Sequence, residues 1–197
     1  MHQFFPVHMK LSPSIKGLLI SVLTVIFAFA IYFFFLAKKN YYLVDNPTEK
    51  TFYFKINNGE EKTIAGNQQF KVDLKQGKNS VKVFDAAKKI LFDSAFVVKK
   101  NRGLLNIAHQ DYYINEQFYG YALNKDSLIT ARKITVIDGK DFVNAPKKMN
   151  KLYSDDFYFN IDEDYDKVIK NIQKVESRSK IFRKVDYLNY YKEYYKF

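Results

Sequence analysis

One stretch near the start of the chain is apolar and carries no charged residue. It runs from Gly17 to Ala37, and lysines close it on both sides, Lys16 before it and Lys38 and Lys39 after it. At a helical rise of about 1.5 Å per residue, such a stretch spans roughly 31 Å, the thickness of a bilayer's hydrocarbon core. The pattern predicts one transmembrane helix over residues 17–37, preceded by a tail over residues 1–16.

The few polar side chains of this stretch are compatible with lipid. Hydroxyl groups in a helix can bond back to its own carbonyls, which leaves no polar group without a partner in the hydrocarbon. Small residues also recur four apart, a spacing that lets another helix pack closely. The residues that we expect in the membrane are Gly17, Ser21, Thr24, Ala28 and Phe34, and the first four of them have the spacing for such a contact.

A cleaved signal peptide is the alternative interpretation of the same stretch. Its one small-x-small site is Ala28-Phe29-Ala30, and seven further apolar residues follow that site. Signal sequences have a shorter apolar region that ends at the cleavage site, so the pattern favours a retained anchor. A helix buried in a soluble core would be apolar all round only inside a large domain, which a chain of 197 residues does not provide.

After the helix the apolar residues alternate with a period of two. Phe52, Phe54 and Ile56 share one face of a strand, and Asn57-Asn58-Gly59 has the composition of a tight hairpin turn. Similar short strands follow at intervals of about 8 to 12 residues, which is typical of an antiparallel β-sandwich. We expect this sandwich over residues 38–108, with Tyr41 and Tyr42 at the membrane interface.

The remaining residues, 109–197, predict a mixed α+β region. A hairpin is expected about Asp138-Gly139, a short strand at residues 157–161, a helix from an N-cap at Asp162 to residue 175, and a second helix over residues 181–195. The predicted fold is therefore a single N-terminal transmembrane helix followed by a mainly-β domain, an antiparallel β-sandwich, which the α+β region extends. Whether that region is continuous with the sandwich stays open.

Part of the sandwich resembles a known family. The features are Asn46-Pro47-Thr48 at a strand entrance, the Asn57-Asn58-Gly59 hairpin, and the corner from Asp73 to Val83, in which Leu74, Gly77 and Val81 keep a leucine-x-x-glycine-x-x-x-valine spacing. This run resembles PEGA-like and related immunoglobulin-like modules of bacterial envelope proteins, without the PEGA tetrapeptide. The wider layout is similar to single-pass proteins of Bacteroidota. The resemblance implies an envelope location and no particular activity.

Orientation in the membrane follows weakly from charge. Lysines flank the helix on both sides in similar number, and long domains cross membranes largely regardless of their charge. A single N-terminal anchor ahead of a β-rich domain commonly serves export, so we expect a single-pass protein of the bacterial inner membrane whose C-terminal domain is periplasmic; the reverse orientation stays open. With the domain in the periplasm, the tail would lie in the cytoplasm.

The composition of the chain excludes several kinds of site and partner. The net charge is +11, aromatic residues make up 18% of the chain, and there is no cysteine, which excludes disulfides, thiolate nucleophiles and Cys-ligated metals. Lysines such as Lys71, Lys75 and Lys82 alternate with apolar residues along strands, so we expect a solvated outer face and no nucleic-acid partner. Anionic lipid headgroups are the partner that this charge favours.

No arrangement of residues predicts catalysis. The acidic residues between Asp155 and Asp166 fit the first turn of a helix, and they lack the glycine and terminal acid of a calcium loop. Gly77-Lys78-Asn79-Ser80 lacks the earlier glycine of a phosphate-binding loop. His109 has no Gly-x-Ser-x-Gly motif to accompany it. We therefore expect no enzyme, no cofactor and no metal site.

Surplus aromatic residues suggest where partners bind, because exposed tyrosine is frequent at interfaces. The candidate partner-contact residues are Tyr112, Tyr119, Tyr187, Tyr190, Tyr194 and Phe197. The first hypothesis is a non-catalytic, membrane-anchored accessory or scaffolding subunit of a complex of larger integral membrane proteins. The alternative is a glycan- or peptidoglycan-binding module that stacks sugars on residues 112–121. An envelope enzyme of unknown class is the third.

Overall fold

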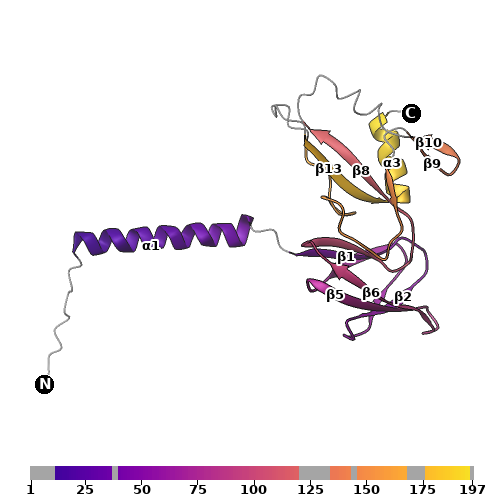
Figure 1. Ribbon diagram of the computed structural model, residues 1–197, viewed down its shortest axis with the longest axis horizontal. Helices are drawn as coiled ribbons and strands as arrows, with labels where there is room; N and C mark the ends of the chain where they lie inside the picture. Colours follow the sequence, from indigo (N-terminus) through magenta and orange to yellow (C-terminus); the bar gives the residue numbers. More distant parts are fainter. Residues whose placement is uncertain (1–11, 37–39, 120–133, 143–145, 168–175, 196–197) are drawn as a thin grey trace. The chain divides into compact units, whose positions relative to one another are not determined.

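The computed structural model describes residues 12–36, 40–119, 134–142, 146–167 and 176–195 (Figure 1). The chain divides into two compact units, Met1–Lys39 and Asn40–Phe197. The described part of the first unit is helical. All described strands belong to the second unit, together with one further helix.

The first unit contains the predicted apolar helix. It consists of α1, Pro13–Ile31, followed by a short π-helical segment, η1, Tyr32–Leu36. The side chain of Ser12 accepts a hydrogen bond from the Ile15 amide at 3.4 Å, and Pro13 occupies the first turn, where no N–H is needed. These two residues start the helix four positions before the predicted Gly17.

Two four-stranded sheets form the predicted sandwich. The first has the order β12-β7-β1-β4 and the second β3-β2-β5-β6. The strands are β1 Tyr41–Asn46, β2 Phe52–Ile56, β3 Lys62–Ile64, β4 Gln68–Val72, β5 Gly77–Phe84, β6 Ile90–Val98, β7 Arg102–Asn106 and β12 Tyr153–Ser154. Buried Val44 and Leu105 of the first sheet pack against Phe54 and Val83 of the second. The pairing is antiparallel except between β1 and β7, which run parallel.

A third sheet lies on the other face of the first sheet. Its order is β11-β8-β13, with β8 Tyr112–Tyr119, β11 Lys147–Met149 and β13 Glu176–Arg183. Leu43 and Leu104 of the first sheet are buried against Tyr112 and Ile181 of the third. The β12-β7-β1-β4 sheet is therefore covered on both faces, and residues beyond position 108 complete its packing.

The last layer covers the third sheet. It consists of α3, Lys184–Tyr195, and the hairpin of β9, Thr135–Ile137, with β10, Lys140–Phe142. Tyr113 and Phe182 from the sheet, Phe142 from the hairpin and Tyr187 from the helix form one buried aromatic cluster. Figure 1 shows the order of these layers, from β5 and β6 through β1 to β8, β13 and α3.

Both predicted hairpin turns are present. Asn57 and Asn58 have φ values of 50° and 57°, and Asp138 and Gly139 have φ values of 51° and 74°. Two consecutive residues with positive φ match the twist of the flanking strands, which is why Asn and Gly occupy these positions. These turns join β2 to β3 and β9 to β10.

The predicted C-terminal helices need correction. Residues 176–183 are strand β13, so the last helix begins at Lys184 and not at Ile181. No helix starts at Asp162, because residues 161–167 are turn and irregular backbone, and residues 168–175 lie outside the described residues. The strand expected over residues 157–161 is reduced to one parallel bridge between Phe159 and Lys180.

Candidate functional site: the anchor helix, the polar junction and the tyrosine–arginine surface

The residues predicted to lie in the membrane are exposed in the first unit. Apolar side chains are accessible around the whole helix; Leu18, Phe27 and Phe34, for example, have exposed fractions of 65%, 67% and 75%. The span Pro13–Phe34 is long and apolar enough to cross a membrane, a property that a signal sequence shares. Such a helix needs an apolar surrounding, because in water its exposed surface would be unfavourable.

The hydroxyl groups of the helix bond to its own backbone. Ser21 donates to the Gly17 carbonyl at 3.0 Å and Thr24 donates to the Ile20 carbonyl at 2.9 Å. Both donors are therefore satisfied without water or a partner. Gly17, four residues before Ser21, and Ala28, four residues after Thr24, are also exposed.

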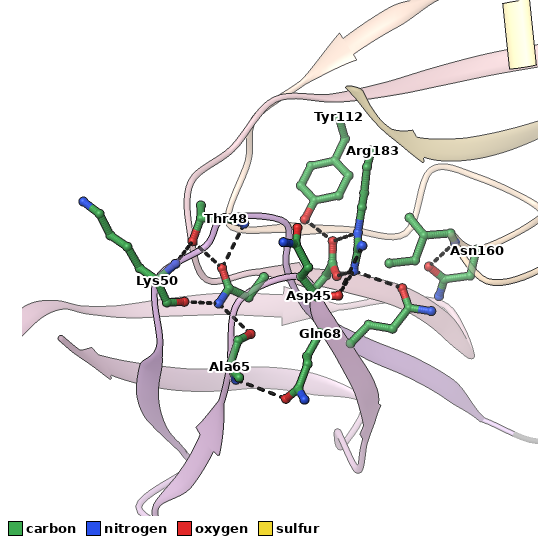
Figure 2. A network of polar contacts seen from close by, with 12 residues as sticks. Asp45, Thr48, Lys50, Ala65, Gln68, Tyr112, Asn160 and Arg183 are labelled. Atoms are coloured by element: carbon green, nitrogen blue, oxygen red, sulfur yellow. Dashed lines mark hydrogen bonds and ion pairs between the residues drawn. The ribbon is translucent and has the colours of Figure 1, made fainter. Parts of the chain in front are cut away.

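A buried carboxylate joins the first sheet to the third (Figure 2). Asp45, on β1, is fully buried. Its Oδ2 accepts hydrogen bonds from the Tyr112 hydroxyl at 2.6 Å and from Arg183 Nε at 3.0 Å, and its Oδ1 pairs with the second guanidinium arm. We call Asp45, Tyr112 and Arg183 the polar junction. Both carboxylate oxygens have charged or hydroxyl partners, as a buried charge requires.

The neighbouring Asn46 organises the loop that leaves β1. Its side-chain Nδ2 donates to the carbonyls of Lys50 and Ala65, at 2.6 and 2.9 Å, and its Oδ1 accepts from the amide and hydroxyl of Thr48 (Figure 2). Asn46 thus links this loop to the backbone at Ala65 through its side chain. The role of these hydrogen bonds is structural.

The polar junction raises the pKa values of Tyr112 and Arg183. Burial raises the pKa of Tyr112 far above its ordinary value, and the charge and hydrogen bond of Asp45 raise it further. Burial alone would lower the pKa of Arg183, but the hydrogen bond and charge of Asp45 raise it overall. The junction therefore consists of a neutral phenol and a guanidinium cation on a carboxylate, which is an arrangement for holding two sheets together.

Three of the tyrosines proposed for partner contact lie in the interior. Tyr112, Tyr119 and Tyr187 have exposed fractions of 0%, 4% and 1%. Tyr112 belongs to the polar junction, and Tyr187 stacks on Tyr113 at 5.6 Å between ring centroids. These residues do not present a surface to a partner in this fold, and β8 provides no exposed platform on which residues 112–119 could stack sugars.

The other proposed residues differ in position. Tyr190 is half-buried and packs on Phe182, whereas Tyr194 is 43% exposed and stacks on Tyr190 at 5.6 Å. Phe197 lies outside the described residues. Among the described members of the proposed partner-contact set, Tyr194 is thus the one that lies exposed at the surface.

The sequence pattern did not reveal a second aromatic surface. Arg102 lies over the rings of Tyr41 and Tyr158, at 5.7 and 6.0 Å, and Arg178 lies over Tyr158 at 4.7 Å. We call Tyr41, Arg102, Tyr158 and Arg178 the tyrosine–arginine surface. Its members come from β1, β7, β13 and a loop, so only the fold brings them together. Tyr158 is 37% exposed.

Tyr41 and Tyr42 were both expected at the membrane interface. Tyr42 is instead 2% exposed, and its hydroxyl donates to the Lys100 carbonyl at 3.0 Å, so it belongs to the sandwich core. Tyr41 is half-buried, because Lys71 and Arg102 cover its ring and its hydroxyl bonds to Asp162.

The acidic residues after position 154 contact lysines and arginines of other elements. Asp155 accepts from the amides of Lys99 and Lys100, at 3.1 and 3.2 Å. Further along the segment, Glu163 pairs with Arg102 and Asp166 with Arg178. These pairs attach the segment to the sandwich on one side and to β13 on the other.

The residues considered for catalysis lie apart. The ring of His109 packs on Phe92, at 4.5 Å between centroids, and its backbone has a φ of 49° in a turn. Ser80 faces Asn57, whose side chain accepts a hydrogen bond from the Ser80 amide. Within the described residues, no group of three or more His, Asp and Glu side chains is placed to hold a metal ion.

Compared with known proteins, the chain matches no family model, no curated protein and no solved structure.

Proposed function

We propose that this chain is a non-catalytic, membrane-anchored accessory or scaffolding subunit of a larger membrane protein complex. The observation that carries the proposal is the helix Pro13–Phe34, which is apolar and exposed on all sides. Lipid, or the helices of other membrane proteins, would satisfy such a surface. The spacing of Gly17, Ser21, Thr24 and Ala28 supports close packing with another helix.

The tyrosine–arginine surface supports contact between the β-rich unit and the same partners. Tyr and Arg are enriched at protein interfaces and among the residues that dominate binding energy. Tyr41 follows the last residue of η1, Leu36, after only four positions in the sequence. Tyr41 is thus close in sequence to the apolar helix.

Purification from native membranes in a mild detergent tests the proposal. A C-terminally tagged chain should bring down integral membrane proteins in fixed stoichiometry. Tyr158→Ala should weaken this association, because it removes an exposed ring that two arginines hold in place. Tyr53→Ala is the matched control, since Tyr53 lies on β2 in the other sheet of the sandwich and its ring is covered by Lys88, which is not part of that surface. A wild-type chain that elutes as a monodisperse monomer contradicts the proposal.

We further propose a location in the bacterial inner membrane with the second unit in the periplasm. The chain has no cysteine, so a single exposed cysteine, Lys192→Cys, gives a clean accessibility probe. A membrane-impermeant maleimide should label this residue in intact spheroplasts. Labelling only after lysis would place the second unit in the cytoplasm.

A further inference from the structure

The outer face of the β3-β2-β5-β6 sheet carries two lysines in an unfavourable arrangement. Lys55 of β2 and Lys82 of β5 lie directly opposite each other in the antiparallel ladder. Like charges in this position destabilise a sheet. Lys82 has a counterion, Asp93 of β6, at 2.8 Å, whereas Lys55 has no ion pair among the described residues. One cationic group on this row is left without compensation.

The same two lysines line a hollow of about 360 Å³. Its other lining residues are polar, acidic or apolar, and the acidic one is Asp93, the counterion of Lys82. Asn58 and Ser80 supply polar groups on one side of the lysine row, and Phe84 and Ile90 supply apolar surface on the other. Phe84 and Ile90 are themselves paired across β5 and β6. The hollow thus carries two lysines and one carboxylate, an excess of one positive charge, with polar groups on one side and apolar surface on the other.

The turn beside the hollow is held rigidly. Asn57 accepts a hydrogen bond from the Ser80 amide at 2.8 Å and donates to Asn79 at 2.7 Å. Asn58 follows in a left-handed backbone conformation, with a φ of 57°. The polar side of the hollow is therefore fixed in the folded chain, so a ligand would not have to order it.

We infer that this hollow binds an acidic saccharide, a sugar unit that carries a carboxylate or a phosphate. The anionic group would lie between Lys55 and Lys82 and relieve their repulsion. The hydroxyl edge of the sugar would face Asn58, Ser80 and Asp93, and its apolar face would lie against Phe84 and Ile90, as sugars lie on aromatic rings. This site is independent of the anchor helix and of the tyrosine–arginine surface.

Titration of the full-length chain in detergent tests the inference with three probes: glucuronate, glucose and inorganic phosphate. Glucuronate should bind saturably, and more tightly than either glucose, which lacks the charge, or phosphate, which lacks the ring. Lys55→Gln should weaken glucuronate binding about fivefold, the loss of one exposed charge contact. Lys140→Gln, an exposed lysine on the β9–β10 hairpin, should leave binding unchanged. Equal affinity for glucuronate and glucose, or for wild type and Lys55→Gln, overturns the inference.

Thermal unfolding gives a second readout that does not depend on resolving a weak affinity. Without ligand, Lys55→Gln should unfold at a slightly higher temperature than wild type, because the repulsion with Lys82 is gone. With saturating glucuronate, wild type should be stabilised by mass action and Lys55→Gln much less. If the variant is destabilised without ligand, or if glucuronate stabilises both chains equally, the site is not the one inferred. Neither result bears on whether the chain co-purifies with membrane proteins.

Discussion

At the residue scale, the polar junction carries the largest single cost of substitution. The side chains of Arg183 and Asp45 are 19% and 0% exposed. Arg183→Met leaves the Asp45 carboxylate buried without its cation, so we expect a loss of about 3 to 5 kcal/mol in the free energy of unfolding. Arg178→Met is the control on the same strand, where the pair with Asp166 is more exposed, and it should cost about 1 kcal/mol or less. Urea denaturation measures both, and similar losses for the two variants contradict the assignment.

Tyr112 makes the stability of the fold sensitive to alkali. Its raised pKa means that the folded chain keeps the phenol proton at pH values where the unfolded chain releases it. This contribution to stability is complete below about pH 10 and is lost as the pH rises further, because the unfolded state then binds fewer protons. Other buried tyrosines, such as Tyr153 and Tyr165, have raised pKa values for the same reason, burial, and act in the same direction.

The variant Tyr112→Phe separates this contribution from the rest. At pH 8 it should lower the free energy of unfolding by about 1.5 to 3 kcal/mol, since it removes a hydrogen bond to a charged group. Between pH 8 and pH 10.5 it should lose less stability than wild type. Tyr194→Phe, an exposed position, should follow the wild-type curve throughout. An unchanged alkaline slope for Tyr112→Phe would show that Tyr112 is not part of the effect.

At the element scale, strand β7 depends on a glycine. A Cβ atom on Gly103 would lie 2.1 Å from the hydroxyl oxygen of Tyr153, whose ring also stacks on Phe96. Gly103→Ala should therefore lower the free energy of unfolding by about 1 to 3 kcal/mol through overpacking. In a Tyr153→Ala background the same change should cost little, because the obstructing ring is absent. Equal costs in both backgrounds would exclude the steric explanation.

The elements also separate what the sequence could predict from what it could not. The hairpin turns at Asn57-Asn58 and Asp138-Gly139 were predictable because their geometry is set by two adjacent residues. Strand β8 was not predictable from the sequence. It is a central strand covered on both sides, and such a strand loses the alternation of apolar and polar residues that marks a half-exposed strand. The apolar Ile181 and Phe182 fit a helical pattern equally well, and only pairing with β8 decides that they form β13.

Some of the candidate sites could likewise be predicted from the sequence, and others could not. The apolar helix was predictable from one continuous stretch, and its start was misplaced because Ser12 and Pro13 extend it. The exposure of the tyrosines proposed for partner contact was not predictable. Tyr112, Tyr119 and Tyr187 are buried, and nothing in the sequence distinguishes a buried tyrosine here from an exposed one. The tyrosine–arginine surface and the lysine hollow gather residues from separate strands, and no local spacing indicates such sites.

At the scale of the whole molecule, positive charge is unevenly distributed. Lys10, Lys16, Lys38 and Lys39 flank the helix without any acidic residue among them, whereas many carboxylates of the second unit pair with lysines and arginines. Lysines at both ends of an apolar span suit the two headgroup regions of a bilayer. The proposed lipid partner would therefore be contacted mainly beside the helix.

Retention of the uncleaved helix in the membrane tests the proposed function most directly. Membranes from cells expressing the tagged chain should be washed with alkaline carbonate, and the intact mass of the retained protein should then be measured. We expect the full 23.3 kDa chain to stay with the membranes and to require detergent for release. A chain released by carbonate, or one whose mass shows that it begins after Ala30, would contradict the anchor and the subunit role built on it.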